Sequence, residues 1–313
     1  MKTRRLALNA VSAAIILLAC SALAHAQATR TWISGVGDDA NPCSRTAPCK
    51  TFVGAFTKTA TGGEINAIDP GGFGPITINR AITLDVGEIY AGISVSGTSA
   101  ITVSAGLNDV VILRNINING LGNSPNGIRY LSGRQLVVEH CVIRGFTTGI
   151  DVNLTASGAL NVRDVEVLQS TPNGGTPASA VGVRVTTTTG TATASIDNLH
   201  TSDLNSYGVQ AQSNAYVTVS NSRFDRTSPN GTGAALQAEN NSNINAESVV
   251  ITLGQNGVQV ASATATIRLS NCDLFSNSVA VNNPGAGTIQ SFVNNRFAGN
   301  ASLGAPVTNV SQK

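Results

Sequence analysis

The chain has 313 residues, with 19 Lys and Arg against 17 Asp and Glu and a formal net charge of +2. Only 12% of the residues are charged and 42% are hydrophobic, which excludes the charge-rich, apolar-poor composition of a disordered chain. The 32 Gly residues, the many Asn, Thr and Ser residues and the single Met favour strands joined by tight turns.

Residues 1–26 have the pattern of a secretory signal peptide. Three basic residues lie within the first five, an apolar run follows as far as Leu23, and an Ala-His-Ala cleavage site precedes Gln27. We expect export to the periplasm or the cell exterior. The mature chain then holds 16 basic and 17 acidic residues, so no bulk attraction to nucleic acid is expected.

A lipoprotein is the alternative for the same segment, with Leu17-Leu18-Ala19-Cys20 as a lipobox and Cys20 carrying the lipid. Leu18 is atypical at its position in such a motif. No later stretch has the roughly 20 continuous apolar residues of a membrane-spanning helix. The sequence therefore predicts no membrane span after the signal peptide.

Residues 27–50 form the next predicted segment, which contains Cys43 and Cys49 in the string NPCSRTAPCK. An oxidising compartment would let them close a small loop as a disulfide, and the two prolines favour a turn there. Zinc is the competing interpretation, but two thiolates do not complete a four-ligand site. Cys141 and Cys272 occupy equivalent positions in a repeat and are expected to be small core side chains.

Asp38 and Asp39 precede this loop and form the chain's one pair of adjacent acidic residues. With Asn41 they offer oxygen ligands suited to calcium. An Asx turn beside the loop is the alternative.

A short capping helix is predicted for residues 51–62. Phe52, Ala55 and Phe56 would lie on one face of a helix and could cover an open sheet edge.

Residues 63–300 are predicted to form a solenoid of stacked strands, because a six-residue pattern Φ-x-x-Φ-x-Φ (Φ is apolar) recurs. A second pattern, Gly-Φ-x-Φ, keeps step with it, so each repeat contains at least two strands. The first pattern begins at Leu113, Val138, Val162, Ile196, Val219, Ala246, Leu269 and Phe292. An insert at Ser170–Ala180 would form a loop, and residues 301–313 are predicted to be a C-terminal tail.

The third position of Φ-x-x-Φ-x-Φ is predominantly asparagine. Asn tolerates the left-handed backbone conformation, and stacked amides can hydrogen-bond from coil to coil. We therefore expect an internal asparagine ladder at a sharp bend. Its members are Asn115, Asn198, Asn221, Asn271 and Asn294.

The segment APCKTFVGAFTKTATGGEINAIDPGGF, followed by these repeats, resembles the entry element of the pectin lyase-like superfamily. The resemblance covers about residue 47 to the C-terminus. Gly63 and Phe73 depart from it, standing where the family usually has Asp and Tyr. It implies an all-β fold, a right-handed parallel β-helix with a short N-terminal capping helix.

One predicted outward column follows from the third residue of each Gly-Φ-x-Φ strand. Two arginines flanking a carboxylate could bind an acidic sugar, and glutamines could bind hydroxyl groups. Alternating charges also stabilise any solenoid face, so a structural role is the alternative. The column reads Ser94, Arg129, Asp151, Arg184, Gln210, Gln237, Gln259 and Ala280. Aromatic side chains that could stack on sugars are largely missing, since Trp32 is the sole Trp and Tyr130 is the only Tyr near this column.

Hydrolases of this fold combine three motifs, N-x-D, an acidic pair and G-H-G. An acidic pair and G-H-G do not occur within the repeats, and N-x-D occurs there only at Asn271-Cys272-Asp273. Glu166, His200 and Arg223 form another outward row, in which a solvated histidine is expected.

The predicted function is an exported, noncatalytic β-helix that binds a polysaccharide or has a structural role at the cell surface, with no cofactor. One alternative is a polysaccharide lyase or hydrolase acting on an acidic glycan, with calcium as a possible cofactor. The other is a self-associating adhesive element, in which the end of the solenoid from Ala298 onward exposes strand edges.

Overall fold

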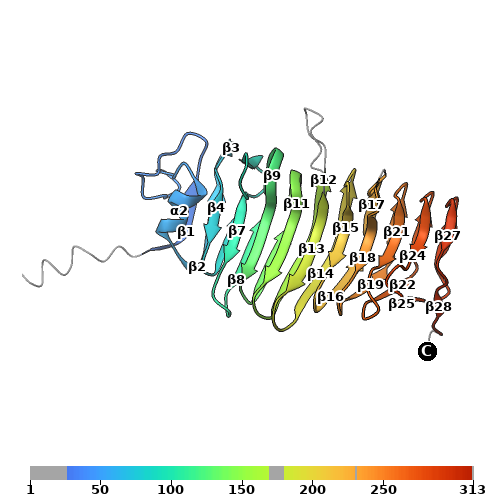
Figure 1. Cartoon of the computed structure of the whole chain (residues 1–313). Coiled ribbons are helices and arrows are strands. Elements are labelled where there is room, and N and C mark those ends of the chain that lie inside the picture. The colour runs from blue at the N-terminus through green and yellow to red at the C-terminus, as the bar shows by residue number, and fades with distance from the viewer. Residues whose placement is uncertain (1–26, 169–179, 230, 312–313) are drawn as a thin grey trace, which may run out of the picture.

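The chain winds into stacked coils of parallel strands. A computed structural model describes residues 27–168, 180–229 and 231–311. The coils follow one another from the N-terminal helix at one end to the C-terminus at the other (Figure 1). The predicted signal peptide and most of the insert Ser170–Ala180 lie outside the described residues.

Three columns of parallel strands form three faces of the solenoid. Face A contains β1 (Ala28–Ile33), β2 (Thr59–Ala67), β5 (Ile82–Asp85), β8 (Val110–Arg114), β10 (Gln135–Glu139), the first parts of β12 (Gly158–Leu168) and β14 (Ala192–Ser202), β16 (Ala215–Ser220), β19 (Asn243–Glu247), β22 (Thr266–Ser270), β25 (Thr288–Ser291) and β28 (Thr308–Asn309). Face B contains β3 (Gly71–Gly72), β6 (Ala91–Ser94), the first parts of β9 (Asn117–Ser132) and β11 (Val142–Leu154), the ends of β12 and β14, β17 (Arg223–Asp225), β20 (Val250–Thr252), β23 (Asp273–Phe275) and β26 (Arg296–Ala298). Face C contains β4 (Ile76–Ile78), β7 (Ile101–Ser104), the ends of β9 and β11, β13 (Val181–Thr187), β15 (Tyr207–Ala211), β18 (Ala234–Ala238), β21 (Asn256–Val260), β24 (Val279–Asn282) and β27 (Ser302–Gly304).

Apolar residues at alternate positions point into the solenoid, as the period-two pattern predicts. On face B, Ile93, Ile118 and Ile143 stack in register and are each at most 1% exposed. Each coil thus covers the core of the one before it, and the predicted parallel β-helix is confirmed.

The bend between faces A and B lies at the third position of Φ-x-x-Φ-x-Φ, as predicted. Asn115, Asn198, Asn221 and Asn271 all have φ between 49° and 63°, a region that Asn enters more easily than most residues. At Asn294 the prediction fails by one position, because Val293 has the left-handed backbone instead (φ 67°).

The predicted ladder makes bonds between coils, but it is not internal. Asn198 Nδ2 donates to Asp164 Oδ1 at 2.6 Å, and Asn271 Nδ2 donates to Ser248 Oγ at 3.0 Å. Both asparagines are exposed, because a residue at an outer corner points away from the core. A buried asparagine lies elsewhere, where Asn277 donates to Ile251 O and accepts from Gly254 N.

The glycines of the Gly-Φ-x-Φ motif, except Gly92 on face B, lie where the chain passes from face B to face C. A Cβ atom at Gly149 would lie 2.5 Å from Val167 Cγ1 and 2.7 Å from Gly182 O in the next coil. The same kind of contact would occur at Gly127, where Ile143 and Gly149 O are the neighbours. These glycines are therefore explained by close packing, since neither has a positive φ.

The N-terminal cap is α2 (Phe52–Lys58), the only helix among the described residues, and it is neither long nor apolar enough to span a membrane. Phe52, Ala55 and Phe56 are its buried residues, as predicted. The predicted end at residue 62 is wrong, because Thr59 has an extended backbone and already begins β2.

Two other predicted boundaries are also wrong. The segment 27–50 is not separate from the solenoid, because β1 pairs in parallel with β2. The tail 301–313 is not a simple extension, because β27 and β28 pair with β24 and β25 as a last coil. Extended backbone continues to hydrogen-bond in register even where the apolar pattern fades.

Thr201 is a polar residue in the core column of face B. It is fully buried between Val167 and Phe224, and its Oγ1 has no hydrogen-bond partner. Thr201→Val is expected to raise the free energy of unfolding by about 1 kcal/mol, because it removes a buried unsatisfied hydroxyl. Urea unfolding measures this change.

Thr252→Val is the matched control, because the Thr252 hydroxyl donates to Asp225 Oδ1 at 2.6 Å. Thr252→Val should lower the free energy of unfolding, because it removes this hydrogen bond. Equal effects of the two substitutions would contradict this explanation.

Candidate functional site

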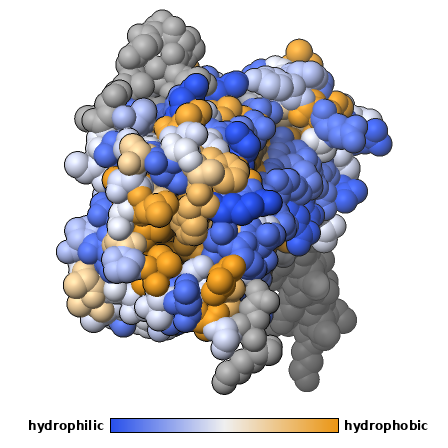
Figure 2. Space-filling model, turned by 90° about the vertical axis from the view of Figure 1, so that its right-hand side faces the viewer, coloured by the Kyte–Doolittle hydropathy of each residue, from blue (hydrophilic) through white to orange (hydrophobic). Residues whose placement is uncertain are grey.

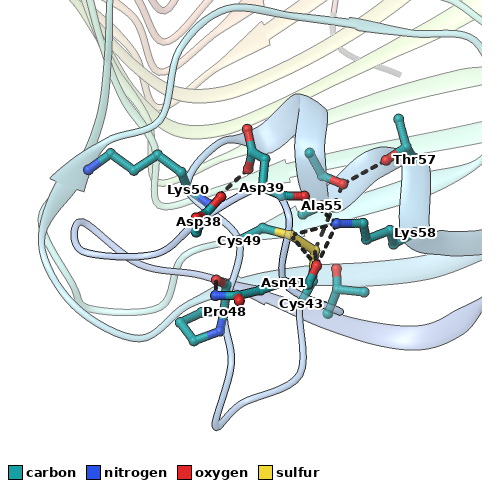
Figure 3. The surroundings of a disulfide bond; sticks show 12 residues. Asp38, Asp39, Asn41, Cys43, Pro48, Cys49, Lys50, Ala55, Thr57 and Lys58 are labelled. Carbon is teal, nitrogen blue, oxygen red and sulfur yellow. Dashed lines mark hydrogen bonds between the residues drawn. A yellow bond between two sulfur atoms is a disulfide. The ribbon is translucent and has the colours of Figure 1, made fainter.

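The predicted disulfide joins Cys43 and Cys49 and fastens the loop beside α2 (Figure 3). Both cysteines are fully buried. The loop also completes the outer edge of β1, because Trp32 N donates to Cys43 O and Ser34 N donates to Cys49 O, each at 2.9 Å. The loop thus has a structural role at the N-terminal end.

The acidic pair beside the loop forms turns and caps. Asp38 Oδ1 accepts from Ala40 N at 2.9 Å, which is the predicted Asx turn. Asp39 accepts from Lys50 N, Thr51 N and Thr51 Oγ1, and these hydrogen bonds outweigh desolvation to lower its pKa. The donor set fits calcium poorly, because the Lys58 ammonium donates to the carbonyl oxygens of Asp39 and Asn41.

Cys141 and Cys272 are buried free thiols, as the repeat predicts. Desolvation raises the pKa of Cys141 to about 12 and that of Cys272 to about 11. Both are thiols at neutral pH and pack as core side chains.

Arg129, Asp151, Arg184 and Gln210 stack in register on face C, as predicted. The two ends of the predicted column are wrong. Ser94 pairs with Asn119 on face B, so Thr102 is the neighbour of Arg129. Ala280 is buried in the core, and Asn282 is the neighbour of Gln259. Segments with the Gly-Φ-x-Φ pattern therefore lie on more than one face of the solenoid.

This column is more enclosed than an outward-facing row suggests. Asp151 is 2% exposed and pairs with Arg184, whose Nη2 lies 2.8 Å from Asp151 Oδ1. Gln210 Nε2 donates to Gln237 Oε1 at 2.7 Å, and Gln237 Nε2 donates to Gln259 Oε1 at 2.8 Å. These side chains bind one another, which supports the structural alternative; a ligand-binding role stays a prediction.

Arg129 differs from its neighbours, because its Nε is buried without a hydrogen-bond partner. Tyr130 beside it cannot stack on a sugar. It is fully buried, donates to Gly133 O at 2.7 Å, and has a pKa raised by desolvation to about 12.

A charged cluster on face B contains the predicted row of Glu166, His200 and Arg223, which lie in register. His200 Nε2 lies 3.3 Å from Asp225 Oδ2, and Arg223 Nε lies 2.6 Å from the same oxygen. Burial alone would raise the pKa of Asp225, but hydrogen bonds from Arg223 and Thr252 lower it below its usual range. The Asp225 carboxylate therefore stays ionised. Its contacts with His200 and Thr252 link its coil to the coils on either side.

A groove of about 380 Å³ lies at the N-terminal end of face B. Tyr90 stands at this groove, is 61% exposed, and accepts from Arg144 Nη2 at 3.2 Å. Its lining contains no carboxylate and no histidine. The lining residues are Pro70, Gly71, Gly72, Tyr90, Gly92, Ser94, Asn117, Asn119 and Arg144.

No family model and no curated protein matches the sequence. Similar solved structures include the pectate lyase Pel9A, with 12% identity and a TM-score of 0.47 over 90% of this chain and 77% of that chain. The GH136 lacto-N-biosidase from Eubacterium ramulus has 8% identity and a TM-score of 0.45 over 91% and 67%. The A-module of the Azotobacter vinelandii mannuronan C-5 epimerase AlgE4 has 11% identity and a TM-score of 0.30 over 80% and 91%.

The fold is a parallel β-helix. Its three strand columns and continuous register define the architecture. Within the described part of this β-helix, no group of three or more His, Cys, Asp or Glu side chains is placed to hold a metal ion.

The groove at Tyr90 was missed by the sequence reasoning. Tyr90 lies just before β6, outside both repeat patterns, and its partner Arg144 is 54 residues away. The position of Arg144 after Ile143 marks it as outward-facing. Only the observed register places the two side chains together.

Proposed function

We propose that the chain is an exported, noncatalytic β-helix protein that binds a polysaccharide in the groove at Tyr90. The observation that carries this proposal is an exposed tyrosine, hydrogen-bonded by an arginine, in a groove whose lining contains no carboxylate and no histidine. Export is part of the proposal and rests on the sequence of residues 1–26.

Each part of the groove suits a sugar. The exposed ring of Tyr90 offers a flat apolar surface with a polar edge. Gly71, Gly72 and Gly92 have no side chains to fill the space beside it. The Asn117 amide makes no side-chain hydrogen bond to another described residue, so it is available for sugar hydroxyl groups.

Arg144 gives the groove a charge preference. Its guanidinium is a planar donor that matches a carboxylate, such as that of a uronic acid. Binding to an acidic polysaccharide should therefore be stronger than binding to a neutral one, and it should weaken as salt is added.

Tyr90→Ala is expected to weaken polysaccharide binding about tenfold, because it removes the only aromatic side chain that lines the groove. Affinity for a panel of acidic and neutral polysaccharides, measured by calorimetry, tests this. Tyr216→Ala is the matched control, because Tyr216 is 46% exposed on β16 of face A, away from the groove. Equal losses in both variants, or no loss in Tyr90→Ala, would overturn the proposed site.

The enzymatic alternative is tested separately by release of reducing ends from the same panel, with calcium and with a chelator. No cleavage is expected, because the groove lining has no carboxylate or histidine for acid and base chemistry. Cleavage under either condition would overturn the noncatalytic part of the proposal.

A further inference from the structure

The C-terminal end of the solenoid leaves the edge of each face open. β26, β27 and β28 each pair with the preceding coil, through β23, β24 and β25. Among the described strands, none pairs with the other side of these three. Open edges of this kind are templates for pairing with another chain.

The same end exposes residues of the core type. Phe297 pairs in register with Leu274, which is fully buried because another coil covers it, whereas Phe297 is only partly buried. Leu303 is 64% exposed and lines a hollow of about 370 Å³ with Val281, Phe297 and Val307. Hydrophobic residues are grouped on this end in Figure 2. Among the described residues, nothing covers the end of this core column.

Charge does not oppose contact between two such ends. Between residues 292 and 311 the only charged side chain is Arg296, whose Nη2 lies 2.6 Å from Asp273 Oδ2. These described residues would therefore bring no unpaired like charge into a contact between two copies.

The opposite end of the solenoid is capped. There the loop of Cys43 and Cys49 hydrogen-bonds to the outer side of β1, and α2 buries Phe52 and Phe56. Stacking of one chain's C-terminal end on another's N-terminal end would meet this cap, so an open filament is disfavoured.

We propose that the C-terminal end binds a second copy of this chain, as a two-fold dimer joined tail to tail. The two-fold axis lies perpendicular to the solenoid, so the edge strands of one copy run antiparallel to those of the other. The contact is isologous, which makes the assembly a closed dimer. Each copy covers the other's Phe297 and Leu303, and the groove at Tyr90 stays exposed at the distant ends.

Sedimentation of the purified chain over a wide concentration range tests the proposal, and a species of twice the monomer mass is expected. Leu303→Asp should give monomer, because each copy would place a carboxylate in the apolar contact. Leu303 is exposed in the single chain, so this variant keeps the fold, which circular dichroism checks.

Leu107→Asp is the matched control, because Leu107 is 63% exposed but lies between β7 and β8, far from the end. It should still dimerise. Monomer alone at every concentration, a dimer that survives Leu303→Asp, or assemblies that grow beyond two copies would each overturn the proposal.

Discussion

Arg184→Ala is expected to lower the free energy of unfolding by about 3 kcal/mol, since it leaves the buried carboxylate of Asp151 without its charge partner. Asp151, the partner of Arg184, is 2% exposed. Arg184 Nε donates to Asp151 Oδ1 at 2.9 Å, and Arg184 Nη2 lies 2.8 Å from the same oxygen. Without Arg184, the carboxylate would lose this partner while its surroundings remain largely closed to water. Urea unfolding followed by circular dichroism measures the change.

Arg163→Ala is the control for this prediction. Arg163 is an exposed arginine on face A, and the loss of such a surface charge costs less than about 1 kcal/mol. The double variant Asp151→Leu/Arg184→Met removes both charges together and should recover most of the stability. A stability of Arg184→Ala equal to that of the native chain would contradict the structural role of the pair.

The solenoid could be predicted because residues at the same position of successive repeats become neighbours when the coils stack. A column such as Leu113, Val138 and Val162 recurs at nearly constant spacing, and stacking the coils brings its members into register. The bend at Asn115 was predictable for a similar reason, since few residue types accept its backbone conformation.

The surroundings of an outward side chain were not predictable in the same way. Alternation tells which side of a strand Asp151 occupies, but its burial depends on neighbours from other coils and on Arg184 lying across it. The groove depends likewise on a contact between Tyr90 and Arg144 that no repeat relates. Local sequence patterns therefore predict the stacked strands. The groove can be identified only once the pairing of strands between coils is known.

Gly208→Ala tests the packing that explains the Gly-Φ-x-Φ motif, and it is expected to destabilise the chain by about 3 kcal/mol through overpacking. A Cβ atom at position 208 would overlap the ring of Phe224 and would lie 2.6 Å from Ala235 O in the next coil. A backbone oxygen in a continuous ladder cannot move without breaking its register, and Phe224 is fully buried. The expected result is a lower midpoint of urea unfolding.

Gly92→Ala is the matched control, because Gly92 begins the same four-letter motif but lies on face B. A Cβ atom there would meet Asn117 O at 3.6 Å, which is ordinary van der Waals contact, so stability should change by less than about 1 kcal/mol. Adding Phe224→Leu to Gly208→Ala should restore part of the loss, since it removes the ring but not the contact with Ala235 O. If Gly208→Ala and Gly92→Ala unfolded at the same midpoint, the motif would need an explanation other than the close approach of faces B and C.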